Sequence, residues 1–279
     1  SLKDLELDLG PGMAVIQGAN GQGKSNLLEA AYVLAIGKSP RASADRELVR
    51  WQPKTADSYS QVSAEIERKA GPVKLRIDFR VPTTGAETNS GAEDAGSTDP
   101  TALNVQKYIR VNGVPRRTSE LVGQLSAVMF SADDLDLVYG SPSVRRRYLD
   151  IMISQLDDRY LRSLQRYQKV LAQRNHLLKL VRQRSATVDE LRFWDEELVS
   201  EGAYIMERRA ETLMSLNGIA GPLHTDLSGA DERLRLIYRP SVEGHAGAGA
   251  NTAAERLTAA LSTERDRELA QGFTLFGPH

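Results

Sequence analysis

The sequence contains no cysteine among its 279 residues. Disulfide bonds and thiolate zinc sites are therefore excluded. No apolar run approaches the roughly 20 residues that a membrane-spanning helix needs, and no secretory signal sequence is visible. We therefore expect a cytoplasmic protein that does not have a membrane as a partner.

An excess of charge of one sign is also lacking. The 36 Lys and Arg residues face 37 Asp and Glu residues, for a net charge of -1. No global field attracts nucleic acid, so any basic surface must be local. The histidines His176, His224, His245 and His279 show no metal-ligand spacing.

A glycine-rich stretch dominates what is present. It consists of Gly18, Ala19, Asn20, Gly21, Gln22, Gly23, Lys24 and Ser25. This stretch fits the P-loop pattern G-x-x-x-x-G-K-[ST]. The apolar run Met13–Ile16 predicts a buried strand before it, and Asn26–Ile36 predicts a helix after it. Strand, loop and helix form the context that a P-loop needs, whereas the alternative is a plain glycine-rich turn before a helix.

Each residue type in this stretch has a physical role in nucleotide binding. Glycines bring backbone N–H groups within reach of phosphate oxygens, and the helix N-terminus adds a partial positive charge. Lys24 is expected to reach the β and γ phosphates of ATP, and the Ser25 hydroxyl to bind Mg²⁺. We therefore predict that Gly18 to Asn26 form an ATP site, with Mg²⁺ as a second cofactor.

Several short segments predict an antiparallel sheet beside the P-loop. Apolar alternation indicates strands over 5–9, 59–67 and 73–81, and Asn112-Gly113 indicates a tight hairpin turn. The polar stretch 82–101 has no aromatic residue, which predicts a disordered surface loop. The segment after the first helix, Gly37 to Arg41, predicts a polar exit loop rather than a second P-loop.

A further buried strand is predicted over Ala127–Phe130, and Asp133 and Asp134 follow it. An apolar strand that ends in an acid resembles a Walker B site. Here the acids come two residues late, so Walker B is only one alternative for this segment.

The second half of the chain predicts long helices. Ser141 is a good N-cap and Pro142 a good first helical residue. The helical pattern beyond them has an apolar stripe of Tyr160, Leu164, Tyr167, Leu171 and Leu178. The helix predicted over 188–216 is rich in acids, so the two helices are expected to pack antiparallel as an arm.

Basic residues form a stripe beside the apolar one. They are Arg159, Arg162, Arg166 and Lys169, with Arg145 and Arg146 near the first helix start and Arg174, Lys179, Arg182 and Arg184 beyond. One interpretation is contact with DNA phosphates. The other is a solvated face whose arginines pair with Glu197 or Glu201. The pattern alone leaves both open.

The remaining segments complete the predicted domain organisation. We expect a strand over 233–238, a helix over 253–269 ended by Gly272, and a strand over 273–276. Residues 1–138 then form an ATP-binding lobe and 139–269 a mainly helical lobe, with 270–279 returning to the first lobe. The fold class is α/β.

These motifs together resemble the RecF family of bacterial recombination-repair ATPases, related to the heads of SMC and ABC-type ATPases. The matching stretches are Gly18–Ser25 with Asn26–Ala30, Gly37-Lys38-Ser39, Asp133-Asp134-Leu135, Gly140-Ser141-Pro142 with Arg145–Asp150, Arg166-Tyr167, Gln173-Arg174-Asn175 and Gly277-Pro278-His279. The resemblance covers most of the chain, and Gly140 to Asp150 is its most specific part.

The resemblance implies an ATP-dependent DNA-binding protein of repair and replication. Such proteins form homodimers around ATP, bind double-stranded DNA near single-strand gaps, and with mediator proteins help to load the RecA recombinase. By the same resemblance Phe130 to Leu135 falls where SMC-like heads carry their Q-loop, which favours that role over Walker B and makes Asp133 the Q-loop candidate.

Some features depart from the family. Ala132 replaces the usual proline, and the family's opening strand, signature motif and Walker B acid are not in this sequence. We therefore expect a fragment that binds ATP without turning it over, while the full-length protein is expected to be a weak, DNA-stimulated ATPase. The alternatives are an SMC-type head, a small-molecule P-loop kinase and an ABC transporter subunit. The first would need a longer arm, the second an acceptor site and the third an early signature motif.

Overall fold

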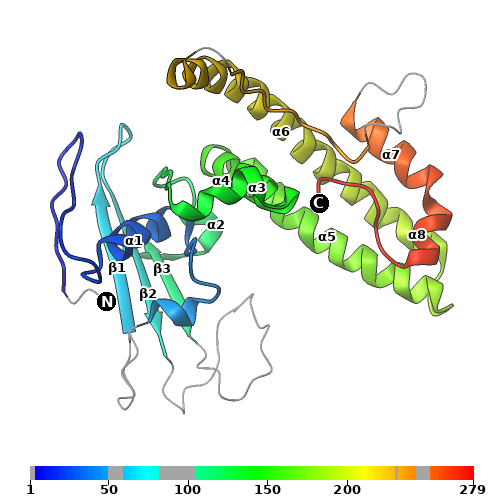
Figure 1. The fold of residues 1–279 in the computed structure, drawn as a ribbon. Helices are drawn as coiled ribbons and strands as arrows, with labels where there is room; N and C mark the ends of the chain where they lie inside the picture. The colour runs from blue at the N-terminus through cyan, green and yellow to red at the C-terminus, as the bar shows by residue number, and fades with distance from the viewer. Residues whose placement is uncertain (1–3, 50–58, 82–104, 230–231, 243–251) are drawn as a thin grey trace. The chain divides into compact units, whose positions relative to one another are not determined.

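The structure is a computed structural model that describes residues 4–49, 59–81, 105–229, 232–242 and 252–279 (Figure 1). The chain divides into two compact units, Ser1–Tyr139 and Gly140–His279, and each is considered by itself. No helix among the described residues is long and apolar enough to cross a membrane. The segment 82–101, predicted to be a disordered loop, lies outside the described residues.

Unit 1 contains a four-stranded antiparallel sheet in the order β1-β2-β3-β4. The strands are β1 (Tyr59–Ile66), β2 (Val73–Arg80), β3 (Gln106–Val111) and β4 (Val114–Arg116). Because side chains alternate across a strand, one face carries the buried residues Leu75, Ile77, Phe79 and Ile109. Helix α1 (Lys24–Ile36) lies against the sheet (Figure 1), and its residues Val33 and Leu34 belong to this same cluster. The predicted side sheet is confirmed.

Short elements connect these parts of unit 1. They are η1 (Asp45–Leu48), α2 (Thr118–Leu121), η2 (Ala132–Leu135) and α3 (Asp136–Tyr139). Asn112 and Gly113 both have positive φ, 51° and 81°, as a two-residue hairpin turn requires, which confirms that prediction. Gly37 ends α1 with φ 76°, and its N–H donates to the Val33 carbonyl at 2.7 Å. The segment after α1 is therefore a helix exit, as predicted.

Three predicted strands of unit 1 are wrong for this structure. Residues 5–9, 13–16 and 127–130 have no strand structure, and Leu9, Met13 and Phe130 are 63%, 93% and 84% exposed. A strand needs a neighbour for its backbone N–H and C=O groups. Within the described residues the four strands of the sheet pair only with one another, so these apolar segments have no ladder to join.

Unit 2 is helical, as predicted. It consists of α4 (Pro142–Leu156), α5 (Asp158–Arg182), η3 (Val188–Glu190), α6 (Leu191–Ser228), α7 (Ala253–Thr263) and α8 (Arg265–Gln271). Ser141 precedes α4 and Pro142 is its first residue, so the predicted helix start is confirmed.

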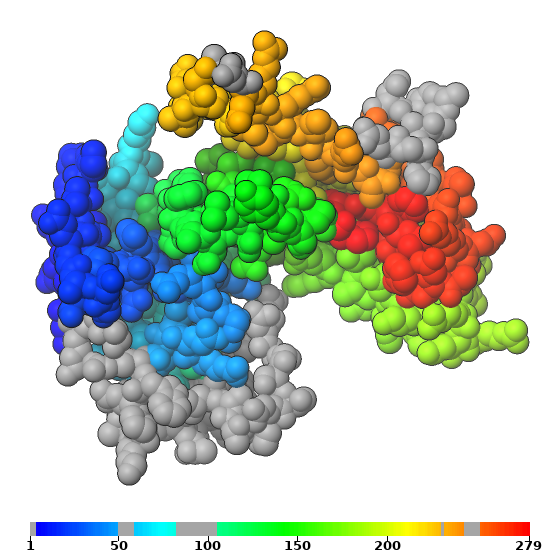
Figure 2. All heavy atoms as spheres, in the orientation of Figure 1, coloured from blue at the N-terminus to red at the C-terminus, as the bar shows by residue number. Residues whose placement is uncertain are grey.

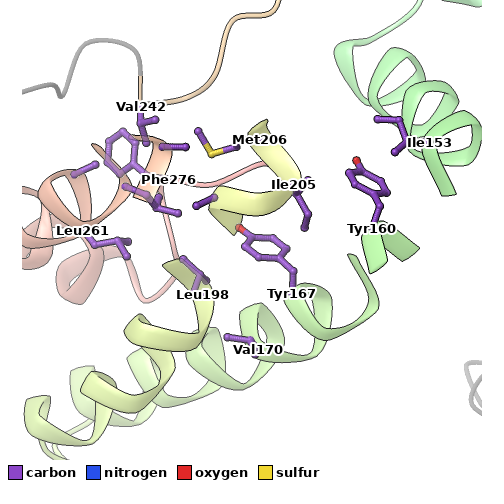
Figure 3. Close-up of a cluster of buried hydrophobic side chains, with 14 of the residues drawn as sticks. Ile153, Tyr160, Tyr167, Val170, Leu198, Ile205, Met206, Val242, Leu261 and Phe276 are labelled. Atoms are coloured by element: carbon purple, nitrogen blue, oxygen red, sulfur yellow. The ribbon is translucent and has the colours of Figure 1, made fainter. Parts of the chain in front are cut away.

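The antiparallel pairing of α5 with α6 is also confirmed. Asp157, Arg166 and Arg174 bind Arg208, Glu197 and Asp195, so the partner numbers fall as the α5 numbers rise. The predicted apolar stripe of α5 lies in the unit core, where Tyr160, Tyr167 and Leu178 are fully or nearly fully buried. Figure 3 shows Tyr160 and Tyr167 with Leu198 and Ile205 of α6.

The end of the chain differs from its predicted course. The helix expected over 253–269 divides at Glu264 into α7 and α8, and α8 packs against α5 (Figure 2). Residues 273–276 form no strand and lie in unit 2, although we expected 270–279 to return to the first lobe. Hydrogen bonds explain this placement, because Arg174 NH1 donates to Thr274 Oγ1 at 2.7 Å and Arg209 NH1 to the Pro278 carbonyl at 2.6 Å.

The predicted strand over 233–238 is also absent. This segment runs beside α6 instead, where the side-chain amide of Asn217 binds the backbone of Leu236 twice, at 2.7 Å each. The amide takes the place of a strand neighbour, because it satisfies one N–H and one C=O of the segment.

Candidate functional site

The P-loop has the backbone shape that its glycines predict. Gly18, Gly21 and Gly23 have φ of 155°, 83° and 90°, a region that residues with a Cβ rarely adopt. A Cβ at Gly18 or Gly21 would meet nothing within 4 Å. The glycines therefore serve the backbone conformation here, and the space beside the loop is open.

The P-loop lysine folds back over its own loop. Lys24 Nζ donates to the Gly18 carbonyl at 2.6 Å and to the Ala19 carbonyl at 2.8 Å. An ammonium group has three donors, so these two bonds leave one for a further oxygen. The positive charge is thus fixed at the start of the loop by the loop itself.

The N-terminus of α1 is built to receive an anion. The helix begins at Lys24, and its first internal hydrogen bond runs from the Leu27 N–H to the Gly23 carbonyl at 3.1 Å. The N–H groups of Lys24, Ser25 and Asn26 precede that bond and have no partner within the helix. No side chain caps this end, and the first turn has no acid. Such an end favours a negatively charged ligand, and the exposed side chain of Ser25 lies in the same turn.

The predicted Q-loop residue Asp133 lies on the exposed side of η2. Its neighbour Asp134 is structural, because its carboxylate accepts the Ser131 N–H at 2.5 Å and caps η2. Since 127–130 is not a strand here, the strand that a Walker B acid needs is absent from the described part of this segment. The Q-loop interpretation of Asp133 stays a prediction.

The basic residues of unit 2 have varied environments. Arg162 and Lys169 are exposed, and Arg145 is exposed with NH1 2.9 Å from the Gly140 carbonyl. The guanidinium of Arg159 lies over the Tyr204 ring at 4.1 Å from its centroid. Arg146 is half-buried.

Arg166 has two acidic partners. It binds Glu197 Oε2 through NH2 at 2.5 Å, and its Nε lies 3.4 Å from Glu201 Oε1. These are the acids that the solvated-face alternative named. The four basic residues of the stripe, Arg159, Arg162, Arg166 and Lys169, all lie on α5. The charge of Arg166 is partly neutralised by these two acids.

Sequence reasoning missed two buried arginines. Arg174 was assigned to the basic stripe, yet its side chain is 0% exposed and binds Asp195 at 2.8 Å and Glu268 at 2.5 Å. The assignment is wrong because residue 174 lies three positions after Leu171 on the apolar stripe, which turns it into the core. That spacing was the signal that could have found it.

The second missed arginine is Arg209. It binds Asp150 at 2.8 Å, and its Nε lies 3.1 Å from the Tyr160 hydroxyl, which itself donates to Asp150 at 2.5 Å. Burial raises the pKa of Tyr160 above its usual value, so the phenol stays neutral. This network joins α4, α5 and α6, and it supports the unit rather than offering a site for a ligand.

Comparison with known proteins adds the following similarities. The profile of a family described as an AAA domain matches residues 1–196. The DNA replication and repair protein RecF of Chloroflexus aurantiacus is 41% identical over 283 residues, covering 99% of this chain and 69% of that protein. The protein of the same name from Bacillus mycoides is 36% identical over 276 residues, covering 99% of this chain and 67% of that protein.

A solved structure is similar as well. It is described as the recombination mediator protein RecF-ATP in the RecFOR pathway, and it matches with a TM-score of 0.76 and 31% identity. The match covers 93% of this chain and 63% of that one. The chain thus spans about two thirds of the length of the relatives that it matches.

Proposed function

Because the chain belongs to the RecF family of DNA replication and repair proteins, with a P-loop NTPase first unit, we propose that it is an ATP-dependent DNA-binding protein of recombinational repair. The P-loop geometry is the observation that supports this best. Within Gly18 to Asn26 the loop holds the Lys24 ammonium group, and helix α1 begins there with no side-chain cap and no acid in its first turn.

Each part of this loop has a role in the proposed ATP site. The N–H groups of Lys24, Ser25 and Asn26 would donate to phosphate oxygens, and Lys24 Nζ would turn its charge toward the β and γ phosphates. The Ser25 hydroxyl would ligate Mg²⁺. No group of three or more His, Asp or Glu among the described residues could hold a metal, so the ion would rely on Ser25, water and the nucleotide.

The proposal extends to the partners of the family. We propose that ATP acts as a dimerisation switch between two copies, and that the dimer binds double-stranded DNA next to single-strand gaps. We also propose that the protein works with recombination mediator proteins, which help it to load the RecA recombinase. We further propose that the protein is cytoplasmic, because the DNA that it would bind lies in the cytoplasm. Asp133 is proposed as the Q-loop residue that senses the metal or attacking water.

The ATP site is tested by changing Lys24 to alanine. A ligand at a hundredfold excess over its Kd stabilises the folded state by roughly 2.7 kcal/mol. ATP with Mg²⁺ should therefore raise the melting temperature of the wild-type protein and leave that of Lys24→Ala unchanged. Lys69→Ala, an exposed cation in the β1–β2 turn, removes the same charge and is the control. Equal shifts in all three proteins would rule out the ATP assignment.

The proposed DNA face on α5 is tested by the double change Arg162→Gln and Arg166→Gln. Each phosphate contact contributes about -0.9 to the slope of log K against log salt on duplex DNA. The variant should bind duplex DNA more weakly at every sequence, with a slope flatter by about two units. ATP binding should be unchanged.

The solvated-face alternative makes a different prediction for the same variant. Its duplex affinity would stay within error of wild type, and its stability would fall slightly through loss of the Arg166 ion pairs. Because Arg162 and Arg166 differ in their partners, the two single variants show which of them touches DNA. If only Arg162→Gln lowers the affinity for duplex DNA, then Arg166 stabilises the pairing of α5 with α6 and does not contact DNA.

A further inference from the structure

The outer face of the side sheet carries a group of cations and tyrosines that the ATP site does not use. The paired registers place these side chains on one face, because partners across antiparallel strands point the same way. The group consists of Tyr59, Gln61, Glu65, Lys74, Arg76, Asp78, Arg80, Tyr108 and Arg110, and we call it the outer sheet face. The opposite face is the buried one that packs with α1 (Figure 1). The outer face is thus not needed for the core of unit 1.

Asp78 holds two arginines together at the centre of this face. Its side chain is 1% exposed, and both of its oxygens lie 3.0 Å from Arg76 Nε. Arg110 NH1 lies 3.5 Å from Asp78 Oδ2. Arg76 and Arg110 are direct partners across β2 and β3, where like charges ordinarily destabilise a sheet. One buried carboxylate needs only one cation for neutrality, so the second guanidinium is in excess.

These guanidiniums are held in place yet reach water. The side chains of Arg76 and Arg110 are 42% and 41% exposed, although both touch a buried carboxylate. A guanidinium carries five N–H donors in a rigid fork, which suits a phosphate oxygen pair. The carboxylates do not repel such a ligand strongly, since Asp78 is buried and Glu65 is bound to Lys74 at 3.1 Å.

Aromatic rings stand beside the cations. Tyr59 is 66% exposed and Tyr108 is 39% exposed, and Arg80 lies over the Tyr108 ring at 5.6 Å from its centroid. From the strand spacing and rise, Tyr59 and Tyr108 are about 12 Å apart. Exposed rings among cations on an open sheet face are an arrangement that binds unstacked bases and their phosphates. Duplex DNA hides its base faces, so these rings would have nothing to stack on, and we expect the face to favour single strands.

We propose that the outer sheet face binds single-stranded DNA, with Tyr59 and Tyr108 stacking on bases and Arg76, Arg80 and Arg110 contacting phosphates. This inference rests on the proposed function, because it gives the same DNA-binding protein a contact for the unpaired strand of a gap. It adds a surface in unit 1 that is distinct from the α5 stripe of unit 2.

The test compares the 279-residue wild-type protein with the double variant Tyr59→Ala, Arg80→Gln. Both residues are exposed, so the fold should be kept, and the melting temperature checks this. The probes are a fluorescent 20-nucleotide oligothymidylate and a 20-base-pair duplex, followed by anisotropy over a salt series. Tyr139→Ala, Arg192→Gln is the matched control, because its residues are 83% exposed and 85% exposed at the side chain.

The proposal expects the double variant to bind oligothymidylate at least about fivefold more weakly, the lower bound for loss of one stacked base. The salt slope should flatten by about 0.7 for the lost phosphate contact. Duplex affinity and the ATP-induced melting shift should stay at the wild-type and control values.

A second variant tests the central arginines without leaving a buried charge unpaired. Arg76→Gln, Arg110→Gln with Asp78→Asn removes the cluster as a unit and should flatten the single-strand slope by about 1.4. Unchanged single-strand binding in both variants overturns the proposal, and so does an equal loss for duplex and single strand. Failure of the wild type to bind either DNA would instead refute the proposed function itself.

Discussion

The buried pair of Arg174 and Glu268 allows a quantitative prediction about unit 2. Both side chains are 0% exposed, and Arg174 NH2 lies 2.5 Å from Glu268 Oε2. Arg174→Met nearly keeps the side-chain volume but leaves the Glu268 carboxylate with the Leu275 N–H, at 2.9 Å, in place of a cation. Removing one member of a buried ion pair costs about 3–5 kcal/mol. We expect a loss of that size in the free energy of unfolding.

The assay is urea unfolding followed by circular dichroism, with the melting temperature as a second measure. For a unit of this size each kcal/mol lowers the melting temperature by about 2–4 °C, so the expected fall is about 6–20 °C. The control is Arg192→Met, whose exposed i,i+4 pair with Glu196 should be worth less than about 1 kcal/mol.

The double variant Arg174→Met, Glu268→Met makes the test specific. With both charges gone, no carboxylate is left stranded, and apolar replacements of buried pairs are often neutral or stabilising. The double variant should therefore be more stable than Arg174→Met alone. A loss below about 1 kcal/mol in the single variant, or a further loss on adding the second change, would show that the stranded charge of Glu268 does not limit the stability of unit 2.

Two further predictions concern a carboxylate and a glycine. Burial opposes ionisation of Asp157, but hydrogen bonds from the Tyr160 N–H, Tyr204 and Arg208 lower the pKa of its carboxyl group. The ionised carboxylate therefore stabilises the fold above about pH 4, and this contribution is lost as the pH falls below that value. The urea midpoint should fall more between pH 5 and pH 3 in wild type than in Asp157→Asn, and parallel pH profiles would contradict this. Gly37→Ala should cost clearly more stability than Gly113→Ala, because φ is similar at 76° and 81° but only at Gly37 would a Cβ lie 2.5 Å from Thr118 Cγ2. Equal melting temperatures for these two variants would show that the contact with Thr118 does not matter.

Local patterns in the sequence predicted most of the elements. The alternation over 59–66 and 73–80, the Asn112-Gly113 turn and the Ser141-Pro142 start each act within a few residues, so the structure confirms them. The P-loop could be predicted for the same reason, because its glycines and helix start are contiguous. The relatives confirm the resemblance to the RecF family, and this resemblance also predicted the fold class correctly.

The errors lie where the outcome depends on distant partners. The apolar runs at 5–9, 13–16 and 127–130 have strand composition, but composition cannot supply the neighbouring strand that a ladder requires. Arg174 looked like a surface cation because its partners Asp195 and Glu268 are 21 and 94 positions away. The outer sheet face was missed because its cations come from strands whose register no local pattern reveals.

The same long separations set an order of events during synthesis. Arg174 leaves the ribosome well before Glu268, which follows 94 positions later. At about 5–20 residues per second this interval lasts roughly 5–19 s. During it α5 and α6 can already pair and Asp195 can bind the guanidinium, while the NH2 group of Arg174 that pairs with Glu268 still lacks that carboxylate. The part of the unit 2 core around Arg174 therefore stays hydrated until α8 has been made.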